Sequence, residues 1–176
     1  MDFFLKENNN FTPFSVQHAI VALFCISFGF ALIFITKKQT SKVQSIIGNI
    51  LAFSICFTVV LGTFIHLYKG NFNIQEDLPL HLCSFLALII PVLSVTKKFV
   101  YYEIFFFLIL AGTLQSLITP DEHNYLNFPF FRYWFVHAGL VVFMFFATFI
   151  YKMRPTLRSV GKSFLGMQAY MLFMFI

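Results

Sequence analysis

The sequence predicts an all-α fold, a polytopic transmembrane helical bundle with five complete spans and a sixth that is cut short. Composition is the first reason, since 59% of the 176 residues are hydrophobic and only 11% are charged. Soluble domains carry about 25% charged residues. The second reason is a series of apolar runs near the span length of about 17–25 residues. Helices follow because lipid cannot satisfy the backbone of open strands.

The spans are predicted at 14–35, 45–68, 79–95, 99–118 and 131–151, with an incomplete one at 163–176. The first run should remain as a helix, because no basic segment precedes it and no small-residue cleavage site follows. Pro79 suits the first turn of the third helix, with Asp77 before it. Pro91 lies inside that helix and can kink it. The last run would rise only about 21 Å, so we expect a fragment or a helix that leans on a partner.

The connections between the predicted spans are short, which predicts one membrane domain over residues 1–176. Basic residues are distributed unevenly between these connections. The first, third and fifth connections hold nine: Lys37, Lys38, Lys42, Lys97, Lys98, Lys152, Arg154, Arg158 and Lys162. The remaining three are Lys6, Lys69 and Arg132. By the positive-inside rule the N-terminus lies on the outer side of the membrane. If the source is bacterial, we expect this membrane to be the cytoplasmic membrane. Basic residues confined to breaks between apolar runs argue against a nucleic-acid partner.

Polar residues within the predicted spans concentrate toward the outer side. This layer contains Gln17, His18, His66, His81, Cys83, Gln115, Ser116, Thr119, Arg132, Tyr133 and His137, with His123 in the adjoining loop. Histidines near helix ends can simply reach interfacial water. Polar groups in a membrane nevertheless tend to face the bundle interior and mark functional sites. We expect at least two members of the layer to form such a site. Glu103, near the inner interface beside Lys97 and Lys98, is given no role.

Cys83 and His137 are the predicted catalytic pair, because a histidine that takes the thiol proton activates a cysteine as a nucleophile. Predicted substrate-binding residues are His66, His81, Gln115 and Arg132. Arg132 can hold a lipid phosphate through its planar donors or simply reach the headgroups. Cys25 and Cys56 lie in mid-span, where cysteine packs as a small hydrophobe. No disulfide framework, metal or cofactor is predicted.

Three segments carry a family resemblance: LPLHLCSF (78–85), TPDEHNYLNFPF (119–130) and RYWFVHAGL (132–140). They resemble the YwaF-like branch of the transmembrane protein 164 family, over roughly residues 45–151. The resemblance implies a multi-helix bundle related to the androgen-induced fatty-acid-ester hydrolases, which pair a threonine with a histidine. In the eukaryotic branch it implies acyl transfer onto ether phospholipids by a cysteine and a histidine. Those two fall on Cys83 and His137.

The first functional hypothesis is therefore a lipid acyltransferase or lipid ester hydrolase whose partners are membrane lipids. A second is a zinc-dependent membrane hydrolase with His66, His81 and His137 as ligands, since three histidines with an open position are a known catalytic set. A third is a non-catalytic membrane protein or a small-solute carrier. Transporters often show internal repeats and helices broken near the midplane. The chain has no convincing repeat, and its polar groups lie away from the midplane.

Overall fold

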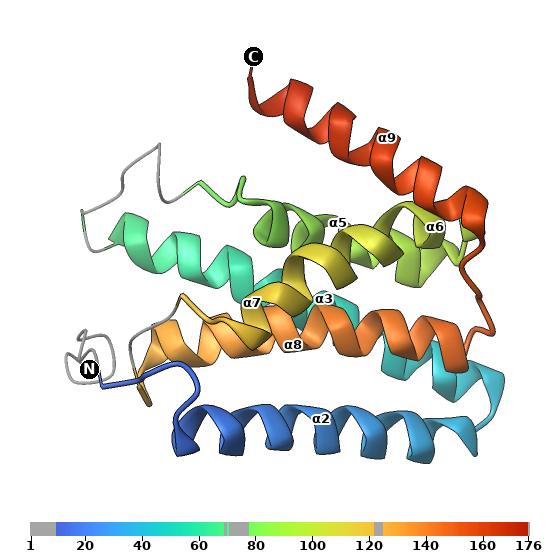
Figure 1. The fold of residues 1–176 in the computed structure, drawn as a ribbon. Helices are drawn as coiled ribbons and strands as arrows, with labels where there is room; N and C mark the ends of the chain where they lie inside the picture. The colour runs from blue at the N-terminus through green and yellow to red at the C-terminus, as the bar shows by residue number, and fades with distance from the viewer. Residues whose placement is uncertain (1–9, 69, 71–77, 122–124, 176) are drawn as a thin grey trace.

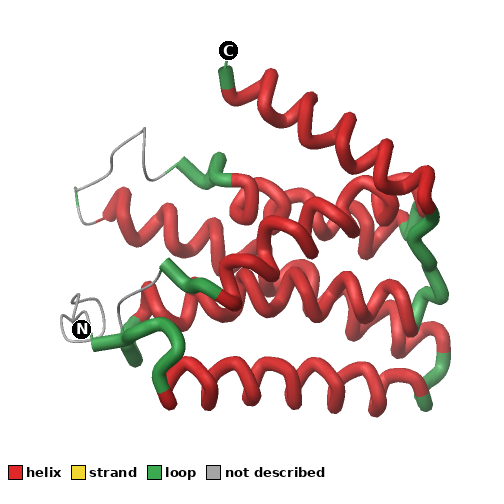
Figure 2. Tube along the Cα trace, in the orientation of Figure 1, coloured by secondary structure: helices red, strands yellow, loops and turns green. Residues whose placement is uncertain are grey.

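The computed structural model describes residues 10–68, 70, 78–121 and 125–175, and these are helical with no strand. Its elements are α2 (Val16–Lys37), α3 (Ser41–Tyr68), α5 (Leu82–Thr96), α6 (Phe99–Leu108), the π-helical turn η1 (Ile109–Thr113), α7 (Leu114–Ile118), α8 (Phe128–Phe149) and α9 (Leu157–Met174). Figures 1 and 2 show the bundle. The predicted all-α class is confirmed.

Four helices are long and apolar enough to cross a membrane: α2, α3, the continuous stretch from Phe99 to Ile118, and α8. The third predicted span is the shorter apolar helix α5, of 15 residues. It begins at Leu82 after the N-cap His81, so the placement of Pro79 in its first turn was wrong. Pro79 lies in the preceding turn, and Asp77 lies outside the described residues. Pro91 is inside α5, as predicted.

The last helix, α9, begins at Leu157, earlier than the predicted start at residue 163. A capping box explains the difference. The Thr156 side chain accepts from the backbone at Ser159, and the Ser159 side chain bonds the backbone N–H of Thr156. These bonds satisfy donors that a helix start leaves unpaired. The helix therefore begins with polar residues, whereas a prediction from hydrophobicity alone placed its start further along the chain.

The core lies where α3, α5 and α8 pack together. Its fully buried side chains include Ile55 of α3, Ile90 of α5 and Phe143 of α8. Gly139 of α8 allows the close approach to α3, because an added Cβ would lie 2.9 Å from Ile55 Cγ1. α2, by contrast, exposes large apolar side chains along most of its length. Such a surface suits lipid, and the bundle is a multi-pass membrane architecture.

The two ends of the bundle differ in charge. α2, α5 and α8 begin at one end, where α3 and α7 finish (Figure 1), and we call it the N-terminal end of the bundle. The nine basic residues listed above all fall at the opposite end, where α2, α5 and α8 finish and α3, α6 and α9 begin. The basic residues of the first, third and fifth connections thus lie together at one end of the bundle.

Glu103 joins α9 to α6 at this basic end. Its side chain is 3% exposed, forms an ion pair with Lys162 and accepts from Ser159 Oγ at 3.0 Å. Ser163 Oγ also donates to the Glu103 carbonyl at 2.7 Å. The expectation that Glu103 reaches the interface beside Lys97 and Lys98 was therefore wrong. Because this carboxylate is buried and has several partners on α9, it is a polar link between α6 and α9.

Replacing Glu103 with glutamine should loosen α9. The amide keeps the size of the side chain but loses the charge that pairs with Lys162. We expect trypsin to cut after Arg158, in the first turn of α9, several-fold faster than in the wild-type protein, because local opening exposes that turn. Lys98→Gln, which removes a nearby exposed charge, is the control. Equal cleavage of the wild-type and Glu103→Gln proteins would contradict a role for Glu103 in docking α9.

Candidate functional site

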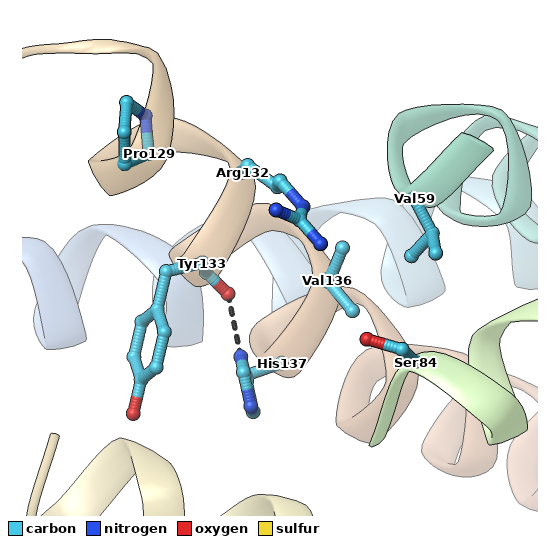
Figure 3. Close-up of a pocket in the computed structure, with 7 residues that line it drawn as sticks. All are labelled: Val59, Ser84, Pro129, Arg132, Tyr133, Val136 and His137. Carbon is cyan, nitrogen blue, oxygen red and sulfur yellow. Dashed lines mark hydrogen bonds between the residues drawn. The ribbon is translucent and has the colours of Figure 1, made fainter. Parts of the chain in front are cut away.

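A pocket of about 200 Å³ lies toward the N-terminal end of the bundle, between α3, α5 and α8 (Figure 3). Its lining residues are Val59, Ser84, Pro129, Arg132, Tyr133, Val136 and His137. α8 supplies five of these seven, and its start is fixed by the buried N-cap Asn127, whose side chain accepts from Phe130 N at 3.1 Å. Two predicted site residues, Arg132 and His137, therefore share one cavity.

His137 is held in a defined protonation form by its own helix. Its Nδ1 lies 2.8 Å from the carbonyl oxygen of Tyr133, one turn earlier. A carbonyl only accepts hydrogen bonds, so Nδ1 carries the proton when the ring is neutral. The lone pair is then on Nε2, at the far end of the ring from that carbonyl (Figure 3). This is the tautomer that a general base needs.

Tyr133 supports the His137 ring from the side. The two ring centroids are 4.2 Å apart, with an interplanar angle of 33°. The Tyr133 hydroxyl donates to the Ser116 carbonyl at 2.7 Å and accepts from the Asp121 backbone N–H at 3.3 Å. These bonds tie α8 to the end of α7 and limit movement of the imidazole. Tyr133 had no separate role in the sequence analysis, although its spacing of four residues from His137 was the available signal.

Cys83 lies in the first turn of α5. Its Sγ is 3.8 Å from Thr113 Oγ1. Thr113 is fully buried and belongs to the π-helical turn η1, a distortion found frequently at functional sites. Tyr133 contacts His137 through its ring, and its hydroxyl bonds the Ser116 carbonyl of α7. Direct contact between the thiol and the imidazole remains a prediction.

Arg132 brings a positive charge to the pocket from the second turn of α8. Its side chain lies across α3 at Gly62, where an added Cβ would be 2.7 Å from Arg132 Nε. Glycine is required there because any larger residue would displace the arginine. Figure 3 shows the guanidinium on the same side of the pocket as Val136, so a cationic donor group stands next to an apolar side chain. That arrangement suits an anionic or strongly polar ligand group.

The other predicted substrate-binding residues do not line this pocket. His66 is half-buried near the end of α3, His81 is exposed at the start of α5, and Gln115 is exposed and donates to Thr119 Oγ1 at 2.8 Å. Their roles stay predictions. His18 is structural: its Nδ1 accepts from Phe14 N at 2.9 Å and its Nε2 bonds the Leu117 carbonyl at 2.9 Å. His123 lies outside the described residues.

The zinc hypothesis finds no support within the described chain, where no three His, Cys, Asp or Glu side chains gather as a metal-binding group. His66, His81 and His137 are all described, so their predicted convergence was wrong. Cys25, Cys56 and Cys83 are free thiols in the described chain. Cys56 packs in α3, with its Sγ 3.9 Å from the Leu88 carbonyl.

Comparison with protein families gives a match over most of the chain. The model of the TMEM164 family matches residues 13–176, which is nearly the whole chain and includes every residue of the pocket. No curated protein and no solved structure matches the sequence.

Proposed function

The chain belongs to the TMEM164 family, and we propose that it is a membrane enzyme that transfers or hydrolyses the acyl chains of lipids. In this proposal Cys83 is the nucleophile and His137 is the general base. Membership of the YwaF-like branch and a relation to the androgen-induced fatty-acid-ester hydrolases are part of the same proposal. The active end would face the exterior, with the nine basic residues on the cytoplasmic side.

The observation that carries the proposal is the state of His137. An imidazole whose Nδ1 proton is held by a backbone carbonyl presents a basic Nε2, and this one lines a pocket beside Arg132 and the first turn of α5. A ring fixed in one tautomer and packed against the tilted ring of Tyr133 is prepared for proton transfer.

The chemistry proceeds in two balanced steps. Nε2 of His137 takes the thiol proton of Cys83, and the sulfur attacks the carbonyl carbon of a lipid ester. The tetrahedral intermediate collapses, the C–O ester bond breaks, and the departing alcohol oxygen receives the proton from His137. An acyl thioester remains on Cys83. A second lipid hydroxyl, or water, then attacks this thioester, with His137 taking its proton and returning it to the sulfur.

The position of the pocket suits a lipid ester. Helix ends lie near the headgroup region, and phospholipid ester bonds lie just beneath the headgroups. Arg132 would bind the anionic headgroup, and His66, His81 and Gln115 would line the approach to it. An aqueous small-molecule substrate would not require an active site built at the end of membrane-spanning helices.

Lipid turnover by the purified chain tests this function. We expect vesicles that contain the protein, a diacyl phospholipid with deuterated acyl chains and an unlabelled lysophospholipid to yield deuterated free fatty acid or a re-acylated product. Mass spectrometry of the extracted lipids measures both. Heat-treated protein in identical vesicles is the control. Unchanged lipids in the presence of folded protein would contradict an acyl-transfer or hydrolase function on these lipids.

A further inference from the structure

Ser84 follows Cys83 in the first turn of α5, and its side chain lines the pocket. Figure 3 shows its hydroxyl directed from α5 toward Val136 and His137 on the opposite wall. Because successive side chains on a helix point about 100° apart, Cys83 and Ser84 face different neighbours. Cys83 contacts Thr113, whereas Ser84 faces the cavity. The sequence analysis gave Ser84 no role.

The Ser84 hydroxyl makes no hydrogen bond within the described residues. Several half-buried hydroxyls in the described helices donate to a carbonyl of their own helix, as Thr58 does to Ser54 at 2.8 Å and Thr148 to Met144 at 2.8 Å. The corresponding acceptor for Ser84 is the Leu80 carbonyl, which already accepts from the Tyr170 hydroxyl of α9 at 2.6 Å. A carbonyl oxygen has two lone pairs, yet Ser84 makes no bond to this one, so its hydroxyl can donate to a molecule in the pocket.

We propose that Ser84 is a further catalytic residue, which donates a hydrogen bond to the carbonyl oxygen of the acyl group under attack. This inference rests on the proposed function. When the Cys83 sulfur adds to the carbonyl carbon, the C=O π electrons move to oxygen and form an oxyanion. The Ser84 O–H stabilises that charge and keeps its own proton throughout. The oxyanion then re-forms the C=O bond as the alcohol departs with the proton carried by His137.

The surroundings of Ser84 make such a bond effective. Val59 and Val136 supply apolar walls, and a hydrogen bond to a developing charge is stronger where water is excluded. Ser84 is also in the first turn of α5, close to the partial positive charge of the helix start.

Two reactions of Cys83 separate this role from a structural one. The first is acylation of purified protein in phospholipid nanodiscs by p-nitrophenyl butyrate, which passes through an oxyanion and releases p-nitrophenolate. The second is alkylation by iodoacetamide, a direct displacement of iodide without an oxyanion. Removing one oxyanion donor slows catalysis by about 100-fold or more. We therefore expect Ser84→Ala to slow acylation by about 100-fold and to leave alkylation at the wild-type rate.

Two variants complete the test. Ser84→Thr retains a hydroxyl and should keep acylation within about tenfold of the wild type. Accommodating one added methyl group costs far less than losing a hydrogen-bond donor. Ser54→Ala removes a hydroxyl that bonds the Leu51 carbonyl of its own helix and should change neither rate. Wild-type acylation rates in Ser84→Ala would overturn the role of Ser84 alone. A wild-type protein that p-nitrophenyl butyrate does not acylate at Cys83 would overturn the proposed function together with it.

Discussion

Cys83→Ala should abolish lipid turnover, with a loss of about 1,000-fold or more in the vesicle assay. Removing the nucleophile of a covalent mechanism leaves only the weak effects of binding and oxyanion stabilisation. Alanine is close in size to cysteine, and the contact of the thiol with Thr113 is long and weak, at 3.8 Å. Folding should therefore survive, and thermal unfolding in detergent measures that directly.

Cys56→Ala is the matched control for this prediction. Cys56 is also a partly buried thiol on a membrane helix, with one weak contact to a backbone carbonyl, and we expect its loss to leave turnover unchanged. Full turnover by the Cys83→Ala protein would exclude a covalent intermediate at that residue. Equal losses in both variants would indicate a folding effect and would also contradict the assignment.

His137→Gln should reduce turnover by about 100- to 10,000-fold, the usual contribution of a general base. Glutamine has a similar length and can keep a hydrogen bond to the Tyr133 carbonyl, which His137 Nδ1 makes at 2.8 Å. It cannot take a proton at neutral pH, so chemistry fails while packing is largely retained. The turnover rate and the apparent KM should be measured together. A mainly binding role would appear as a raised KM with an unchanged maximal rate, and that result would contradict the base assignment.

The membrane helices were the most predictable part of the molecule. Four of the predicted spans match helices that are long and apolar enough to cross a membrane, because a lipid environment imposes a simple rule on length and hydrophobicity. Prediction failed at the starts of α5 and α9. The capping box at Thr156 starts α9 before its apolar run. α5 starts at Leu82, after Pro79, without a side-chain cap from His81.

The pocket was predicted only in part. Depth along each helix placed His137 and Arg132 at one level, and the structure puts both in one cavity. Depth says nothing about rotation around the helix axis, so His66 and His81 were grouped with them without lining that cavity. The roles of Ser84 and Tyr133 depend on which carbonyls are already engaged, such as that of Leu80, and these bonds join residues far apart in the chain. No spacing in the sequence encodes them.

Coupling between the thiol and the imidazole is tested most directly by the pH dependence of Cys83 alkylation in the wild-type and His137→Gln proteins. Iodoacetamide reacts with the thiolate, and mass spectrometry of the Cys83 peptide follows this site apart from Cys25 and Cys56. If His137 takes the thiol proton, the wild-type protein should react about tenfold faster at pH 7, with the two rates converging at high pH. Superimposable pH profiles would contradict a Cys83–His137 pair.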